Sequence, residues 1–340
     1  MNLADFPVLL GRLAAGHALS AAEADTAFAT IMGGEVPPAI IGAFLMGLKM
    51  HGEGADDLAA AARALRARVV PVNAPDTAVD TCGTGGDGLS TLNVSTAVAI
   101  VVAACGVPVA KHGNRSATSK SSSAGVLEAL GIRVDAPVPR VQRCLDELGI
   151  TFMLANAHHP AMRAVADVRR QLGIPTIFNL VGPLSNPAAI RRQVVGVFGE
   201  PWLDRMAEAL AQLGTRHAWV VHGAGGMDEL SLAGPSHVAE LKDGTVRRFT
   251  LTPADAGLAE APVDAIRGGD VDHNAAALRR LLAGEPGAYR DTVLYNAAAA
   301  LIVGDRATTL TDGVAQAARV LDNGAAGTLL DRWVALTQEA

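Results

Sequence analysis

A glycine-rich segment in the first third of the chain carries the first residues whose types and spacing suggest chemistry. The segment DTCGTGGDGLSTLNVST (residues 80–96) places Gly83, Gly85 and Gly88 in the spacing G-x-G-x-x-G, which is typical of a dinucleotide site between a strand and a helix. Such a site also needs an acidic residue about 20 positions further on to bind the ribose. The sequence has the basic segment VAKHGNRSATSKSSS (109–123) there instead, and no Gly-Lys-Ser/Thr triplet follows the glycines. Both a dinucleotide site and a P-loop are therefore disfavoured.

The second segment is itself suited to phosphate. It combines Lys111, His112, Arg115 and Lys120 with several hydroxyl side chains, so we expect a basic loop rich in hydrogen-bond donors. The glycine loop adds backbone N–H groups near the start of a helix, where anions bind readily. Together the two loops predict a site for two phosphate groups of one small ligand. The alternative is a tight strand–helix turn without a ligand, and it explains the glycines but not the second loop.

Carboxylates beside this site predict a divalent cation. Asp87 would repel phosphates unless it binds a ligand hydroxyl or acts through a metal ion. Asp228 and Glu229 follow a predicted strand and a glycine turn in GAGGMDELSL, and neighbouring carboxylates are ligands that Mg²⁺ uses together with substrate phosphates. Taken alone, an Asp-Glu pair is more often solvated surface.

An arginine pair and a histidine pair are the remaining polar candidates. Arg169 and Arg170 lie in ADVRRQLG, and a guanidinium can hold a carboxylate through two hydrogen bonds, although a solvated helix face is the commoner role. His158 and His159 precede a proline. Because no nearby ligand set completes a metal site, we favour a packing or gating role over a catalytic one.

The elements that position these residues suggest two units. Residues 1–72 predict a small helical domain, with Ser20 and Glu23 in capping-box spacing before an apolar helical pattern. Residues 73–340 alternate short apolar runs with helices, which predicts an α/β domain with a mostly parallel central sheet flanked by helices. The segment 158–190 is too helical for a simple crossover, and we expect it to join the N-terminal helices and leave a cleft. After residue 251 we expect helices and loops. The candidate strands are 78–81, 107–111, 132–134, 150–154, 194–198 and 218–221.

Composition narrows the partners. The chain carries 28 Lys and Arg against 34 Asp and Glu, a net charge of −6, so neither nucleic acid nor an anionic membrane is expected to bind it. Cys82, Cys105 and Cys144 are too scattered for a disulfide framework or a metal site, which favours a cytoplasmic protein. The N-terminus lacks the pattern of a signal peptide, and the longest apolar run, residues 97–110, is too short to span a membrane. We interpret that run as the end of a buried helix followed by a buried strand.

Six segments taken together carry a family resemblance. They closely resemble the anthranilate phosphoribosyltransferases of tryptophan biosynthesis, which join anthranilate to phosphoribosyl pyrophosphate (PRPP). They occur in order within residues 75–235 and are GTGGD (83–87), NVST (93–96), KHGNRSATS (111–119), VRRQLG (168–173), IFNLVGPLSNP (177–187) and GGMDELS (225–231).

The resemblance implies a helical domain and an α/β domain with the active site between them, Mg²⁺ as the cofactor, and a homodimer. It places Ser95, Asp228 and Glu229 at the metal, and Gly83, Asn114 and Arg169 at anthranilate. The residues that it places around PRPP are Gly83, Gly86, Asp87, Thr91, Asn93, Val94, Ser95, Thr96, Lys111, His112, Gly113, Asn114, Arg115, Ser116, Ala117, Thr118, Ser119 and Ser123.

The chemistry that the resemblance implies needs no acid–base residue. The amine of anthranilate is already neutral at pH 7, so we assign no catalytic side chain in that sense. We expect acceleration from electrostatic stabilisation of the leaving pyrophosphate and from alignment of the amine with the ribose C1.

Three other functions remain open from the sequence. A pyrimidine nucleoside phosphorylase resembles this architecture, but its second loop resembles K-x-S-G-R-G, whereas this one is KHGNRS. A nucleic-acid-binding relative without the transferase activity should carry a basic stripe, which the negative net charge disfavours. An NAD-dependent dehydrogenase lacks its acidic ribose ligand.

Overall fold

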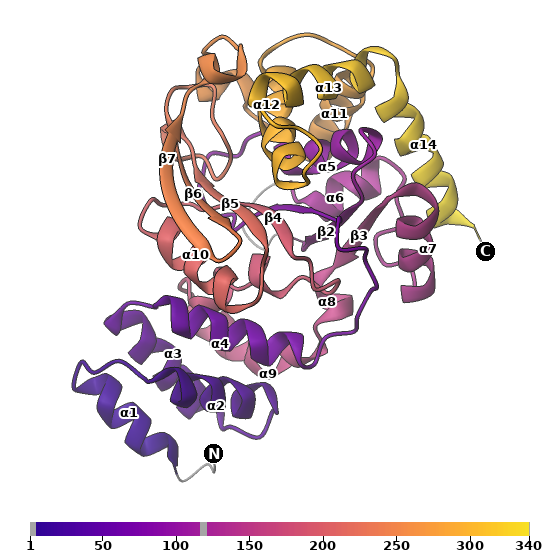
Figure 1. The fold of residues 1–340 in the computed structure, drawn as a ribbon. Coiled ribbons are helices and arrows are strands. Elements are labelled where there is room, and N and C mark those ends of the chain that lie inside the picture. The colour runs from indigo at the N-terminus through magenta and orange to yellow at the C-terminus, as the bar shows by residue number, and fades with distance from the viewer. Residues whose placement is uncertain (1–4, 116–120, 340) are drawn as a thin grey trace.

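The N-terminal part of the chain is helical, as the capping and periodicity predict. We describe a computed structural model, which covers residues 5–115 and 121–339. The side chain of Ser20 accepts a hydrogen bond from Glu23 N (3.3 Å), and Glu23 Oε2 accepts one from Ser20 N (2.8 Å), so the predicted capping box forms. The first four helices, drawn in indigo in Figure 1, are α1 (Phe6–Ala14), α2 (Ala21–Met32), α3 (Pro38–His51) and α4 (Ala55–Arg66).

A mostly parallel sheet follows, and the predicted fold class is confirmed. The main sheet has the order β1-β4-β5-β6-β7, and β2 pairs with β3 in parallel. A parallel bridge between Val79 and Val109 joins the two sets of strands side by side. β6 and β7 run antiparallel at one edge. The strands are β1 (Asp80–Gly83), β2 (Val109–Gly113), β3 (Ile150–Leu154), β4 (Arg192–Gly196), β5 (His217–His222), β6 (Ser236–Lys242) and β7 (Thr245–Leu251).

The strand order determines where a ligand can bind. From β1 the chain proceeds to β2 and β3 on one side, and it later returns to β4 and β5 on the other side. The order therefore reverses at β1, and open α/β sheets bind ligands in the crevice beyond the carboxyl ends of the strands at such a point. The glycine loop follows β1, the basic loop follows β2, and the turn that contains Asp228 follows β5.

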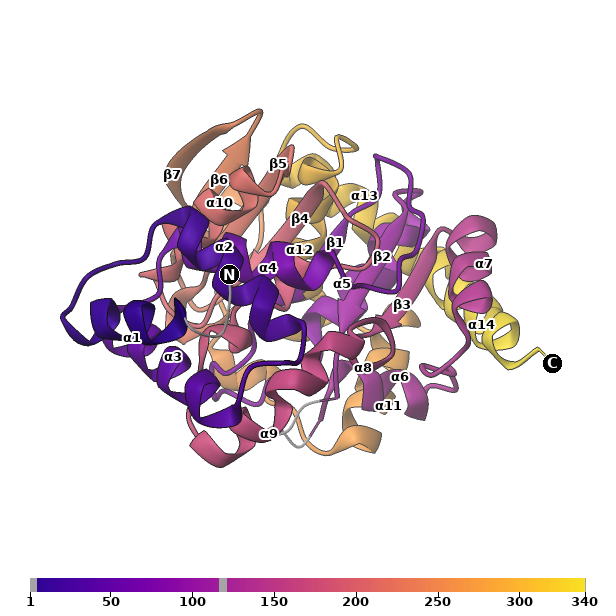
Figure 2. The same cartoon turned by 90° about the horizontal axis from the view of Figure 1, so that it is seen from below.

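Successive residues of the strands pack alternately into two hydrophobic cores. Val194 and Val221 face the core built on α5, whereas Val195 and Val220 face the core shared with α10 and α4, as the period of two in a strand requires. Figure 2 shows α1 and α14 at opposite ends of the molecule. The α/β part adds α5 (Val94–Ala104), α6 (Ser123–Ala129), α7 (Val138–Leu148), α10 (Trp202–Gln212), α11 (Val271–Leu282), α12 (Ala288–Val303), α13 (Leu310–Asp322) and α14 (Ala325–Gln338).

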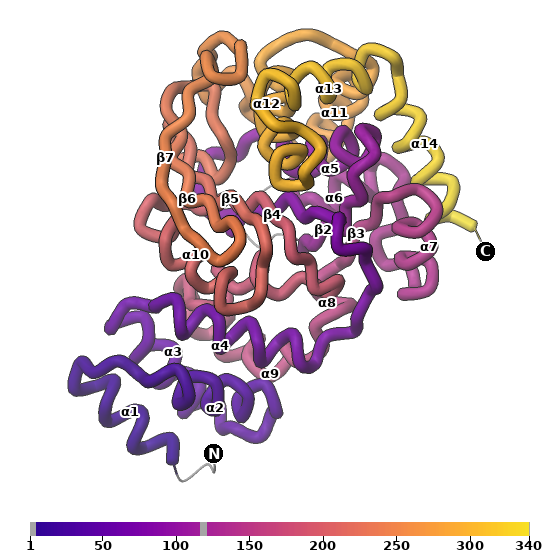
Figure 3. Tube along the Cα trace, viewed as in Figure 1, coloured from indigo at the N-terminus to yellow at the C-terminus, as the bar shows by residue number. Residues whose placement is uncertain are grey.

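The segment after β3 packs against the N-terminal helices. It contains α8 (Ala155–His158) and α9 (Arg163–Leu172), followed by two short 3-10 helices, Ile177–Asn179 and Pro183–Ser185. Phe178 meets Phe28 edge-on at 6.1 Å between ring centroids. The connection from α4 back to β1 can be followed in Figure 3. Because this core also takes in valines of β4 and β5, the division into residues 1–72 and 73–340, with 158–190 added to the first unit, stays a prediction.

One predicted strand is wrong, and one hairpin was not predicted. Residues 132–134 form no strand: Ile132 N donates to Leu127 O (2.9 Å) just after α6, so this apolar run is the hydrophobic contact that follows a helix C-cap. The hairpin of β6 and β7 was not predicted. Its turn is Asp243-Gly244, with φ of 46° and 82°, the Asp-Gly turn that favours a two-residue hairpin.

The long apolar run was interpreted correctly. Residues 97–110 comprise most of α5 and the start of β2. No helix in the part of the chain that the structure describes is both long and apolar enough to cross a membrane.

Candidate active site

The glycine loop after β1 has left-handed backbone conformations, with positive φ, that only glycine adopts without strain. Gly85, Gly86 and Gly88 have φ of 64°, 85° and 73°. Asp87 Oδ1 accepts a hydrogen bond from Leu89 N (3.1 Å), which closes the turn. Gly85 N donates to Asp228 Oδ2 (2.9 Å), so one amide of the loop is already used to hold a carboxylate.

Three carboxylates converge on this loop. Asp87, Asp228 and Glu229 each offer an oxygen, and the three oxygens lie within 4.8 Å of one another. Burial of Asp228 (8% exposed) and the nearby Asp87 charge raise the pKa of Asp228 to about 6. Burial and the charge of Asp228 raise the pKa of Glu229 well above its usual value. The cluster is therefore electrostatically unfavourable by itself and would be stabilised by a cation.

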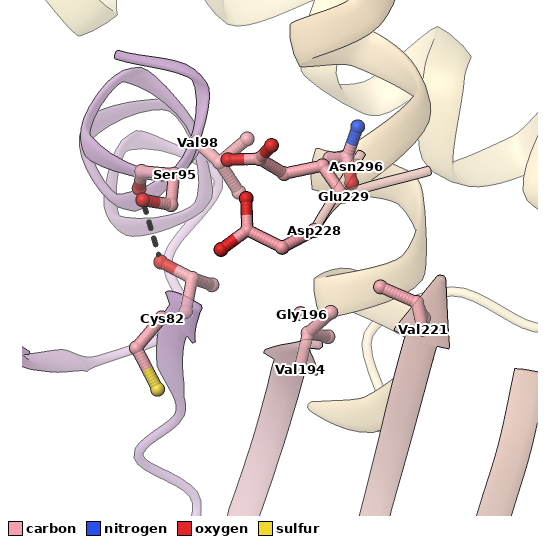
Figure 4. A pocket seen from close by; sticks show the side chains of 10 residues that line it. Cys82, Ser95, Val98, Val194, Gly196, Val221, Asp228, Glu229 and Asn296 are labelled. Carbon is pink, nitrogen blue, oxygen red and sulfur yellow. Dashed lines mark hydrogen bonds between the residues drawn. The ribbon is translucent and has the colours of Figure 1, made fainter. Parts of the chain in front are cut away.

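The donor set fits Mg²⁺. Glu229 Oε2 is buried and has no hydrogen-bond partner among the described residues. Figure 4 shows Asp228 and Glu229 facing Ser95 across a small pocket beyond the ends of β4 and β5. Carboxylate and hydroxyl oxygens are the hard ligands that Mg²⁺ prefers. The structure thus brings together the predicted ligands Ser95, Asp228 and Glu229. It also places Asp87, for which a ligand hydroxyl or a metal ion was expected, in the carboxylate cluster.

Three glycines allow the Asp-Glu turn to approach the sheet. A Cβ on Gly196, at the end of β4, would lie 1.4 Å from the carbonyl oxygen of Asp228. A Cβ on Gly223 would lie 2.3 Å from the carbonyl oxygen of Glu229, and one on Gly83 would lie 2.3 Å from Asp228 Oδ2. Real side chains do not fit at such distances, so these glycines determine where the carboxylates lie.

The N-terminus of α5 lies beside the carboxylates. Asn93 precedes the helix, and its Oδ1 accepts hydrogen bonds from Asn274 Nδ2 (2.9 Å) and Ser121 Oγ (3.2 Å). Val94 and Thr96 are buried, so we expect them to contribute backbone N–H groups rather than side chains. Thr91 pairs with Arg267 through an antiparallel bridge, which fixes the end of the glycine loop.

Lys111 lies beneath the site rather than in the loop after β2. Its side chain is 2% exposed, and Nζ donates to Thr81 O and to Ser95 Oγ (3.3 Å). Burial lowers its pKa, and the neighbouring Asp80 carboxylate opposes that shift. The ammonium therefore reaches the site through the hydroxyl of Ser95.

His112 does not contribute the positive charge that the sequence analysis expected. Its side chain is 6% exposed, and Nδ1 donates to Gly182 O (3.1 Å). Burial, and next the adjacent His159, lower its pKa to about 3, so the ring is neutral at pH 7. Its ring centroid lies 5.0 Å from that of His159.

The rest of the basic loop is described in part. Gly113 ends β2 close to the Phe152 ring, and Asn114 Oδ1 accepts a hydrogen bond from Arg115 N (2.8 Å). Arg115 is paired with Glu128, so its charge is compensated. Ser123 begins α6. The predicted residues Ser116, Ala117, Thr118 and Ser119, together with Lys120, lie outside the described residues.

Arg169 and Arg170, two of the three arginines of α9, have different surroundings. Arg169 is half-buried, with its guanidinium 5.7 Å from the centroid of the Phe178 ring and Nη2 3.5 Å from Asn179 Oδ1. It has no ion pair within residues 5–115 and 121–339. Arg170 is exposed and pairs with Asp167 (2.6 Å). Of these two, Arg169 presents an uncompensated guanidinium that packs on an aromatic ring.

The buried histidines predict a loss of stability in acid. His158 Nδ1 donates to Val70 O (2.7 Å), and burial lowers the pKa of His159 to about 4. An unfolded histidine takes up its proton near pH 6.5, whereas folded His112 and His159 do so only at lower pH. The free energy of unfolding should thus fall from pH 6.5 towards 4, by up to about 1.4 kcal/mol per pH unit for each histidine. Urea unfolding of the wild type and of His159→Gln checks this, and equal pH slopes for the two would contradict it.

Comparisons with known proteins agree with this geometry. Residues 75–327 match the model of the glycosyl transferase family a/b domain, and residues 7–69 match the model of its helical bundle domain. An anthranilate phosphoribosyltransferase of Parvibaculum lavamentivorans is 54% identical over 335 residues, 98% of each chain. The chain belongs to the anthranilate phosphoribosyltransferase family.

Solved structures of anthranilate phosphoribosyltransferases have the same fold. A crystal structure of the enzyme from Thermus thermophilus is similar with a TM-score of 0.92 and 44% identity, covering 97% of this chain and 99% of that one. The enzyme from Saccharomyces cerevisiae in complex with PRPP and Mg has a TM-score of 0.89 and 26% identity, covering 98% of both chains. The family resemblance predicted from the sequence is confirmed.

Three amide side chains that support the site, buried Asn274 and Asn296 and exposed Asn179, were not predicted from the sequence. Asn296, Asn274 and Asn179 hold, respectively, the Asp-Glu turn, the residue before α5 and the start of the 3-10 helix that contains Phe178. A signal existed for Asn296, since it is a polar residue in the otherwise apolar run LYNAAAALIV. Buried polar residues inside an apolar helix usually have a hydrogen-bonding role.

Proposed function

We propose that this chain transfers the phosphoribosyl group of PRPP to the amine of anthranilate, giving N-(5-phosphoribosyl)anthranilate and pyrophosphate, in tryptophan biosynthesis. The observation that carries this proposal is the cluster of Asp87, Asp228 and Glu229. It lies against the glycine loop at β1, where the strand order of the sheet reverses. Carboxylates gathered beside anion-binding amides are expected where a divalent cation accompanies a diphosphate. The full-length similarity to anthranilate phosphoribosyltransferases supports the same substrates.

The diphosphate of PRPP is assigned to the space between the two predicted loops. The amides of residues 86–88 and the N-terminus of α5 would supply hydrogen-bond donors, while Lys111 acts through Ser95. Ser95, Asp87, Asp228 and Glu229 would hold Mg²⁺. The remaining PRPP residues keep the assignment that the resemblance gives them.

The chemistry that these residues perform is stabilisation of the leaving group. The bond between C1 of the ribose and the pyrophosphate oxygen breaks, its electron pair leaves with pyrophosphate, and the amine nitrogen bonds to C1 before losing a proton. Mg²⁺, when bound, supplies positive charge next to the leaving oxygens. The loop amides are fixed before the reaction, so their dipoles need no reorganisation as the charge develops.

We assign Arg169 to the carboxylate of anthranilate. That carboxylate would be the ion-pair partner that the guanidinium lacks among the described residues. We expect Arg169→Ala to weaken apparent binding of anthranilate by about 2–5 kcal/mol, the usual cost of removing one member of a buried charge pair. Arg170→Ala is the matched control, because Arg170 lies next to it, is exposed and already pairs with Asp167. Steady-state saturation curves for anthranilate check this. An unchanged KM in Arg169→Ala would remove Arg169 from the site.

The proposed function is tested by mixing the protein with anthranilate, PRPP and Mg²⁺ and following the fluorescence of anthranilate. A decay that needs all three components is expected. No decay, together with phosphorolysis of thymidine or uridine, would favour the nucleoside phosphorylase. A gel shift with duplex DNA at physiological salt would favour the nucleic-acid-binding relative.

Assembly and compartment are also proposed. Val8 and Met50, on α1 and α3, are 66% and 81% exposed, and such residues would suit a contact with a second copy. Light scattering should give twice the chain mass of 34.8 kDa, and a single-chain mass would contradict the homodimer. The cytoplasm, predicted from the scattered cysteines, stays a prediction.

A further inference from the structure

One side chain outside the predicted site makes an unusually complete set of contacts with it. Asn296 lies on α12 and is 4% exposed. Its Oδ1 accepts a hydrogen bond from Leu230 N (2.9 Å), and its Nδ2 donates to Leu230 O (2.9 Å) and to Thr292 O (2.9 Å). The amide therefore pairs with both backbone groups of Leu230, as a neighbouring strand would.

This pairing fixes the peptide group that adjoins Glu229. Leu230 N belongs to the peptide bond that follows Glu229, so its orientation helps to set the direction of the Glu229 side chain. Glu229 Oε2 has no hydrogen bond of its own within the described residues. The backbone contact at Leu230 thus restrains the position from which the Glu229 side chain extends.

The same face of α12 supports the other side of the site. Tyr289 lies seven residues before Asn296, or about two helical turns, which places the two on one face. Tyr289 Oη donates to Asn93 O (3.2 Å), the residue that precedes α5. One rigid helix therefore contacts both the turn that carries Asp228 and Glu229 and the segment that leads to Ser95.

We propose that Asn296 is a positioning residue that holds the Asp228–Glu229 turn in the geometry that receives the divalent cation of the PRPP complex. The proposal rests on the proposed function. A purely structural residue would affect folding and the binding of all substrates alike. A residue that orients metal ligands would instead change the Mg²⁺ concentration that PRPP binding requires.

The test measures PRPP binding by calorimetry at a series of Mg²⁺ concentrations, without anthranilate. We expect the Mg²⁺ concentration that half-restores PRPP binding to rise about 10- to 100-fold in Asn296→Ala, the usual effect of removing a residue that orients metal ligands. Excess Mg²⁺ should restore binding, and at saturating Mg²⁺ the KM for anthranilate should stay within about twofold of the wild type.

The matched control is Leu301→Ala. Leu301 is fully buried on the same helix and its side chain makes no hydrogen bond to the turn, so this variant reports the effect of destabilising α12 alone. An unchanged Mg²⁺ requirement in Asn296→Ala, or an equal rise in Leu301→Ala, would overturn the proposal.

A second variant and the behaviour of the wild type separate the possible outcomes. If Asn296→Ala fails to fold, Asn296→Ser is measured in the same way, since a serine hydroxyl keeps a polar group there but cannot pair with both groups of Leu230. Its expected and contradicting results are the same. Failure of the proposed function is a different outcome, in which the wild type binds no PRPP at any Mg²⁺ concentration.

Discussion

Asp228→Asn is expected to lower kcat/KM by a factor of about 10²–10³, the effect of removing one preorganised group that stabilises developing charge. Asparagine keeps the size of the side chain and an oxygen that can accept from Gly85 N, so the glycine loop keeps its hydrogen bond. It removes one charge from the three carboxylates that would hold Mg²⁺. Steady-state kinetics over a range of Mg²⁺ concentrations measures the effect.

Two companion variants define the result for Asp228. Asp243→Asn is the control, because Asp243 lies in the exposed hairpin turn, where asparagine also suits the backbone. Glu229→Gln should likewise raise the Mg²⁺ concentration needed for half-maximal activity. Metal titrations of Asp228→Asn and Glu229→Gln that match the wild type would refute the metal role of both carboxylates.

Gly196→Ala is expected to have the largest effect on stability. The added Cβ would lie 1.4 Å from the carbonyl oxygen of Asp228, and no rotamer change can relieve a contact with backbone. The cost should therefore exceed the roughly 1–3 kcal/mol that overpacking usually causes. Urea unfolding should show this loss, and Mg²⁺-dependent activity should fall with it because the turn that carries Asp228 must move.

Gly199→Ala is the matched control for that substitution. Gly199 lies in the loop that follows β4, and a Cβ there would meet only Trp202 Cδ1 at 3.7 Å and Pro201 Cδ at 3.8 Å, which are ordinary contacts. Only in Gly196→Ala does the added Cβ meet the carbonyl oxygen of Asp228. Equal free energies of unfolding for them would contradict the close approach at Gly196.

Local signals in the sequence predicted most of the elements. The capping box of Ser20 and Glu23, the helix-to-strand run at residues 97–110 and the strand at 150–154 all depend on neighbours in the chain. Residues 132–134 were assigned wrongly because a short buried apolar run after a helix cap has the same pattern as a strand. The Asp243-Gly244 turn carried a readable hairpin signal that was not used.

The site was harder to predict because its parts are distant in the chain. Asp87 meets Asp228 and Glu229 only because β1 pairs with β4, and β4 with β5, an order that no local pattern encodes. The charge state of His112 depends on burial beside His159, which comes from a different segment. Asn296 acts on Leu230 through a helix placed by the hydrophobic core, so its role emerges only from the packing.

The proposed function requires a divalent cation and the diphosphate of PRPP to bind at the carboxyl ends of β1, β4 and β5, between the glycine loop and the loop after β2. The most direct measurement is a crystal structure with PRPP and Mn²⁺, in which anomalous scattering locates the metal. We expect a peak coordinated by carboxylates of the Asp87, Asp228 and Glu229 cluster, with the diphosphate beside residues 83–88. A peak and a diphosphate bound elsewhere in the molecule would contradict it.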